Sequence, residues 1–95
     1  MITITARQRV VAGKEVELEA VMKSLVEQVK KNEPKCTIFE FLRAQEQPGI
    51  YMVIEQYFDQ AALDQHLAQP YLQDRLPKIF ACLQCEPELT TYTDT

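Results

Sequence analysis

His66 is the only histidine of the chain, and its side chain is the first candidate for acid–base chemistry. An imidazole exchanges protons near neutral pH, so a buried or half-buried histidine can accept a proton from a weakly acidic substrate. Ala62, Leu63 and Leu67 surround it at helical spacing, which indicates a helix face directed at a sheet. A catalytic base and a histidine that only packs in the core both fit this pattern.

Glu55 is a carboxylate near the end of residues 50–58, a segment that is otherwise largely apolar. An unpaired buried charge is costly, so this carboxylate requires a partner. It could orient His66 and balance its charge, as a carboxylate orients the imidazole in a catalytic triad. The alternative is an ordinary strand-end residue that bonds to a loop or to a second subunit.

Aromatic side chains could line an apolar cavity for a planar aromatic ligand, with phenols as oriented hydrogen-bond donors. The candidates are Tyr51, Tyr57, Tyr71, Phe39 and Phe41. Packing in the core or between two subunits is the alternative for each of them.

The cysteines do not indicate a redox or metal site. Cys82 and Cys85 have CxxC spacing, but a redox CxxC normally opens a helix and this pair closes one. A zinc site needs two more ligands, and only Cys36 and His66 remain. No phosphate-binding loop, dinucleotide fingerprint or hydrolase motif is present. We therefore expect no metal, no cofactor and three free thiols in a reducing compartment.

Hydrophobic periodicity defines the elements that must position these side chains. Alternation predicts strands over residues 2–10, 36–43, 50–58 and 86–93. Three- and four-residue spacing predicts helices over residues 15–32 and 60–68 and from 70 to about 83. Pro77 predicts a kink or a break in the last of these.

The order strand, helix, strand, strand, helical segment, strand is the ferredoxin-like βαββαβ pattern of an α+β fold. It predicts one domain over residues 1–95, with a four-stranded antiparallel sheet and helices on one face. Residues 36–43 and 50–58 are apolar on both faces, so both faces must be covered. We expect a homodimer that closes the second face, as a dimeric α+β barrel.

Composition excludes several classes of partner. The chain has 95 residues and a formal net charge of −4, which disfavours binding to nucleic acid and to an anionic membrane surface. No segment approaches the ~18 consecutive apolar residues of a membrane span. The first five residues alternate apolar and polar and do not resemble a signal peptide. We therefore expect a cytoplasmic protein.

Nearly the whole chain resembles the antibiotic biosynthesis monooxygenase domain family, which includes the quinol monooxygenases. The resemblance is carried by residues 13–15 at the start of the first helix, by residues 36–41, and above all by the run from residue 55 to 70. Glu55 and His66 are eleven residues apart, as in the family pattern. The family commonly has a second histidine directly after the proline, where this chain has Tyr71.

The resemblance implies a cofactor-independent monooxygenase that oxidises a small aromatic or quinol-type substrate with molecular oxygen. His66 would be the base and Glu55 its orienting carboxylate. Two alternatives are open. One is an isomerase of the same fold that acts on a small signalling or catabolic metabolite, and the other is a non-catalytic dimer that binds a small ligand.

Overall fold

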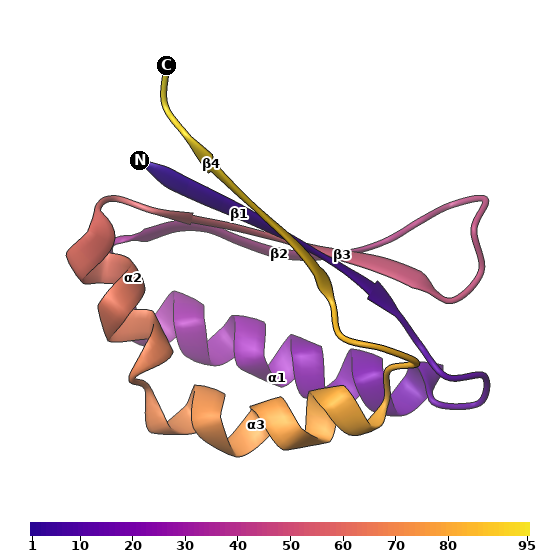
Figure 1. Ribbon diagram of the computed structural model, residues 1–95. Helices are drawn as coiled ribbons and strands as arrows, with labels where there is room; N and C mark the ends of the chain where they lie inside the picture. Colours follow the sequence, from indigo (N-terminus) through magenta and orange to yellow (C-terminus); the bar gives the residue numbers. More distant parts are fainter.

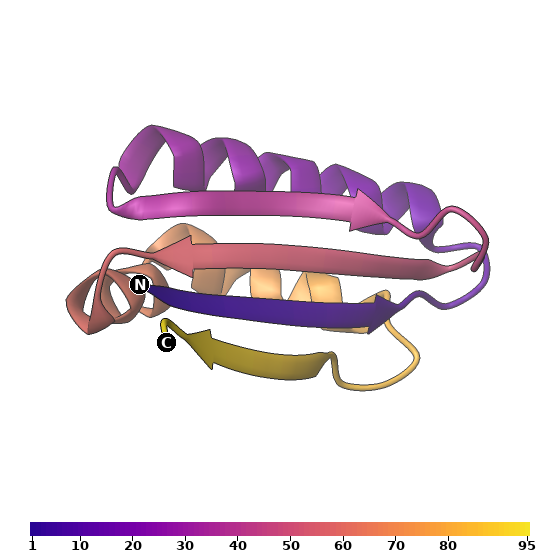
Figure 2. The same ribbon diagram turned by 90° about the horizontal axis from the view of Figure 1, so that it is seen from above.

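The protein is a two-layer α+β structure, described over residues 1–95 by a computed structural model (Figure 1). Its elements are β1 (Ile2–Arg9), α1 (Glu15–Asn32), β2 (Cys36–Arg43), β3 (Ile50–Tyr57), α2 (Gln60–Leu67), α3 (Pro70–Ala81) and β4 (Glu88–Thr93). The strands form one antiparallel sheet in the order β2-β3-β1-β4 (Figure 2). This arrangement confirms the predicted ferredoxin-like fold.

The helices cover one face of the sheet, and α1 and α3 lie side by side on it (Figure 1). The stripe that α1 buries has helical spacing and consists of Leu18, Met22, Leu25 and Val29. This stripe packs with the inward side chains of the sheet in one core of 13 buried residues. No helix of the structure is both long enough and apolar enough to cross a membrane.

Local sequence signals explain where α2 and α3 begin. The Asp59 side chain caps α2 by accepting a hydrogen bond from the Ala62 backbone N–H at 2.9 Å. Pro70 occupies the first turn of α3, where a missing N–H costs nothing. Of the two outcomes expected at Pro77, a kink or a break, the break does not occur, because α3 continues through this residue. Pro77 and Gln73 are both exposed, so water can satisfy the carbonyl that proline leaves without a donor.

The second face of the sheet, here called the outer face, carries no helix (Figure 1). In β3 the buried side chains alternate with Ile50, Met52 and Ile54, which point to the outer face. Ile38 and Leu42 of β2 lie beside them and are 37% and 46% exposed. The outer face is therefore apolar over β2 and β3, whereas β1 presents Thr3, Thr5 and Arg7 there.

Candidate functional site

Helix α2, which carries His66, lies at the end of the molecule where the two chain termini are found (Figure 1). His66 belongs to the last turn of α2, one helical turn after buried Ala62, so both side chains face the sheet. The imidazole is only 3% exposed. It packs between the rings of Phe39 and Tyr57, with centroid distances of 5.4 and 5.3 Å.

Glu33 holds the imidazole in place. Its carboxylate oxygens lie 3.0 and 3.1 Å from Nδ1 of His66, and one of them also accepts a hydrogen bond from the Tyr71 hydroxyl. Glu33 directly follows the end of α1 and is only 8% exposed. A buried carboxylate must be paired, and these two donors satisfy it.

Glu55 lies on the other side of the ring. Its Oε1 atom is 3.9 Å from Nε2 of His66, which is too far for a hydrogen bond. The same oxygen accepts a hydrogen bond of 2.5 Å from the Tyr57 hydroxyl. Burial raises the pKa of Glu55, and the nearby charge of Glu33 adds to that rise. In this structure Glu33, rather than Glu55, makes the hydrogen bond that orients the imidazole.

The hydrogen bonds define which ring nitrogen is free to react. A carboxylate only accepts, so the Nδ1 atom facing Glu33 carries the proton in the neutral ring. The lone pair of that ring then lies on Nε2, on the side of Glu55. His66 and Glu55 both line the same cavity. The accepting nitrogen therefore lies beside Glu55, and both residues border a space where a ligand can bind.

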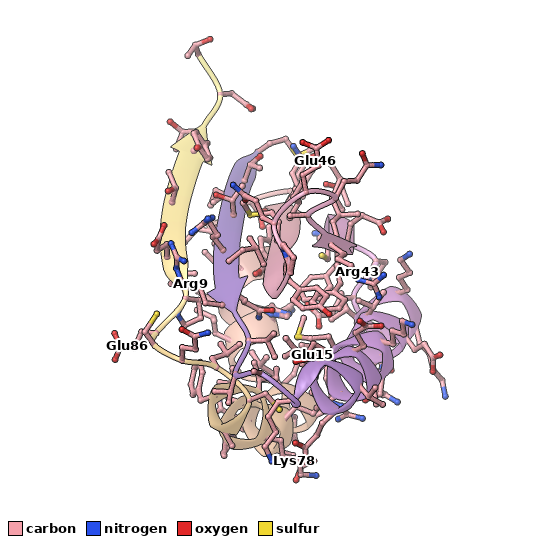
Figure 3. The ribbon with its side chains drawn as sticks, turned by 90° about the vertical axis from the view of Figure 1, so that its right-hand side faces the viewer. Arg9, Glu15, Arg43, Glu46, Lys78 and Glu86 are labelled. Atoms are coloured by element: carbon pink, nitrogen blue, oxygen red, sulfur yellow. The ribbon has the colours of Figure 1, made fainter.

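This cavity has a volume of about 520 Å³ and lies between the helices and the covered face of the sheet. That size suits a small organic ligand. Its walls are mostly apolar and include Ala6, Leu25, Phe39, Val53, Leu72 and Ile79. Exposed apolar side chains of Leu67, Phe80 and Leu89 form part of its lining. Glu86, in the loop between α3 and β4, stands exposed at the side of the molecule (Figure 3).

The five aromatic side chains that the sequence offered as cavity candidates fall into three groups. Phe39 lines the cavity. Tyr57 and Tyr71 instead bind the two carboxylates, and burial is the main cause of a raised pKa in both phenols. Each phenol therefore stays protonated, and its hydroxyl donates a hydrogen bond to a carboxylate.

Tyr51 and Phe41 lie outside the cavity. Their rings stack on each other, with centroids 4.9 Å apart. The Tyr51 hydroxyl donates to Glu19 of α1 at 2.6 Å, and Arg43 reaches the same carboxylate at 2.7 Å from the end of β2 (Figure 3). This cluster joins the sheet to α1 at the end of the molecule away from His66.

Two residues of the site were missed by the sequence analysis. Glu33 gave no local signal, because it is one more glutamate beside a helix end and a proline. Gln8 lines the cavity and is buried, and here a signal existed. It interrupts the apolar side of β1, where Ile2, Ile4 and Ala6 precede it. A polar residue at a core-facing position is a common sign of a functional site.

The structure brings no three His, Cys, Asp or Glu side chains together as ligands for a metal ion. The thiols of Cys36, Cys82 and Cys85 are free, and Cys82 is buried whereas Cys85 is exposed.

Comparisons with known proteins agree with this fold. The model of the family named antibiotic biosynthesis monooxygenase matches residues 1–75. A Caulobacter crescentus structure that carries the family name superimposes with a TM-score of 0.94 at 26% identity, covering 99% of this chain and 89% of that chain. A conserved protein from Methanosarcina mazei gives a TM-score of 0.92 at 28% identity, with 99% and 92% covered. No curated protein matches the chain.

Proposed function

Because this chain belongs to the antibiotic biosynthesis monooxygenase family, we propose that it oxidises a small aromatic or quinol-type substrate with molecular oxygen and without a cofactor. One observation carries the proposal. A buried imidazole, held by Glu33 through Nδ1, lines a cavity that is otherwise largely apolar. That arrangement suits the removal of a proton from a flat, weakly acidic molecule.

The chemistry would reside in the substrate. His66 takes a phenolic proton, and the resulting anion is electron-rich enough to react with oxygen directly. A new carbon–oxygen bond forms a hydroperoxide on the ring, which then loses water and leaves a carbonyl. A hydroquinone plus O₂ thus gives a hydroxyquinone plus H₂O, and the substrate supplies all the electrons.

The protein contributes positioning and a dry environment. Apolar walls exclude water, which strengthens the interaction between the substrate anion and the imidazolium that forms. Glu33 stabilises that imidazolium through Nδ1. Glu55 lies 3.9 Å from Nε2, so it can stabilise the same positive charge from the cavity side.

The proposed working unit is a homodimer. The outer face of the sheet exposes apolar side chains from β2 and β3, and Tyr92 of β4 is 53% exposed on the same face. A contiguous apolar patch on a soluble domain usually marks an interface. A second copy placed across a two-fold axis would cover this face with an identical one.

Oxygen uptake tests the proposal. A panel of reduced quinones and polyphenols is offered to the wild-type protein in an oxygen electrode, with the uncatalysed rate subtracted. His66→Ala should lower turnover about 10²–10⁴-fold, the usual contribution of a general base. Gln65→Ala, at an exposed position of the same helix, is the matched control and should keep full activity.

The outcomes separate the alternatives. Near-native turnover by folded His66→Ala would contradict the assignment of the base. Conversion of a substrate without oxygen uptake would point to an isomerase that uses the same imidazole. Binding without any turnover would point to a non-catalytic ligand-binding dimer.

A further inference from the structure

Gln8 is a buried polar side chain that the protein itself leaves largely unpaired. It is 4% exposed and lines the cavity. Its Oε1 atom has no hydrogen-bond partner. Its Nε2 atom makes one weak contact, with the Met22 sulfur at 3.9 Å. A carboxamide offers two donors and an acceptor with two lone pairs, so most of its capacity is unused.

Such a side chain is unusual, because buried polar groups are nearly always paired and an unpaired one destabilises the fold. Leucine or methionine at this position would pack against the neighbouring apolar walls without that cost. Gln8 is at the same time one of the residues that line a cavity large enough for an organic molecule. A polar atom of a ligand is therefore the partner that fits this position.

The strand register places Gln8 at a distance from the imidazole. On β1, Ile4 pairs with Glu55, Ala6 pairs with Val53, and Gln8 pairs with Tyr51. Gln8 is thus four residues further along the sheet than Glu55, or about 13–14 Å at the usual rise per residue. The lining between these levels is apolar, with Ala6 and Val53 on the sheet.

We propose that Gln8 is a second polar anchor, which hydrogen-bonds an oxygen at the end of the substrate remote from the group that His66 deprotonates. The proposal rests on the site described under the proposed function and narrows its substrate class. The preferred ligand is a flat aromatic molecule of two or more fused rings with an oxygen at each end. Gln8 is then a positioning residue, since it touches no reacting atom.

Anaerobic binding tests this assignment. The probes are 2,6-dihydroxynaphthalene, which has a hydroxyl at each end, and 2-naphthol, which has only one. Fluorescence titration gives both dissociation constants for the wild-type protein, Gln8→Met and Gln8→Leu. The wild-type protein should prefer the diol about tenfold, the worth of one hydrogen bond. Both variants should lose this preference and bind 2-naphthol as the wild-type protein does.

Controls separate this role from a structural one. Gln45→Met, at an exposed loop position, should keep the wild-type preference. Gln8→Met should melt no lower than the wild-type protein, because it removes an unpaired buried group. An unchanged preference in both Gln8 variants, or a wild-type protein without a preference for the diol, would overturn the assignment. Because oxygen is absent, a Gln8-dependent preference supports the anchor even if no turnover is ever found.

Discussion

Glu33 gives the sharpest test of the site, because the structure assigns it two donors in a buried setting. Glu33→Ala leaves the buried Nδ1–H of His66 unpaired, at a cost of about 1–3 kcal/mol. It also removes the partner of the Tyr71 hydroxyl, which costs less because Tyr71 is only half-buried. Glu33→Ala also removes a negative charge from the C-terminal end of α1, where the helix dipole disfavours it, and this stabilises the fold by about 0.3–1 kcal/mol. We expect Glu33→Ala to lower the free energy of unfolding by about 2–3 kcal/mol in total.

That loss is large for so small a domain. A domain of this size shifts its melting temperature by about 4–8 °C per kcal/mol, so Glu33→Ala should melt roughly 10–20 °C lower.

Glu33→Gln keeps the shape and removes the charge that stabilises the imidazolium. An equivalent change in a catalytic triad lowers turnover about 10⁴-fold, and we expect a loss of about 10²–10⁴-fold here. Thermal melts and oxygen uptake measure the two effects.

Glu27→Ala is the matched control, because Glu27 is an exposed glutamate of α1, the helix that Glu33 follows. A Glu33→Ala protein that melts within a few degrees of this control would show that the buried hydrogen bonds contribute little. Full turnover by Glu33→Gln would show that the charge beside Nδ1 has no part in catalysis. Either result would refute the reasoning that places Glu33 at the centre of the site.

Three further predictions concern Glu55, the thiols and the outer face. Burial raises the pKa of Glu55 above its ordinary value of 4.5, so the folded protein holds this proton more tightly than the unfolded chain does. Urea titrations should therefore show the wild-type protein losing stability relative to Glu55→Gln as the pH rises from 4.5 through the raised pKa; a relative gain would contradict this. Burial raises the pKa of the Cys36 thiol to about 12, so iodoacetamide should alkylate exposed Cys85 before Cys36. Mass spectrometry measures the order, and earlier alkylation of Cys36 would contradict this prediction. Light scattering should give a dimer that Met52→Asp, on the outer face, dissociates; a stable wild-type monomer would exclude the interface.

Much of the fold could be predicted because its signals are local. The stripe of Leu18, Met22, Leu25 and Val29 is visible as helical spacing before any contact is known. The alternation in residues 50–57 likewise separates an inner from an outer side chain at each step. At Pro77 the sequence left both a kink and a break open, because the cost of a proline depends on whether water reaches the freed carbonyl; α3 continues through it. Access of water to that carbonyl is a property of the folded surface.

The site was predictable only in part, because its contacts join residues that are distant in the sequence. His66 could be singled out by type, yet the partner of its Nδ1 atom lies 33 positions earlier. Glu55 was the nearer candidate by pattern, and the fold places it beside the other nitrogen instead. Gln8 could have been found from the sequence, because the alternation of β1 already places this polar residue on the side that faces the core. A polar break in an apolar face is a signal that sequence reasoning can use.

The charges around His66 also limit what the cavity can accept. Two carboxylates, Glu33 and Glu55, flank a single imidazole, and none of the three side chains is more than 15% exposed. An anionic ligand would meet both charges at close range, where screening by salt is weak. A neutral phenol that enters and then gives its proton to Nε2 avoids this repulsion, because the imidazolium forms beside the carboxylates together with the substrate anion. The same charges that disfavour a carboxylate ligand thus favour transfer of the proton after binding, which is the order that base catalysis on a quinol requires.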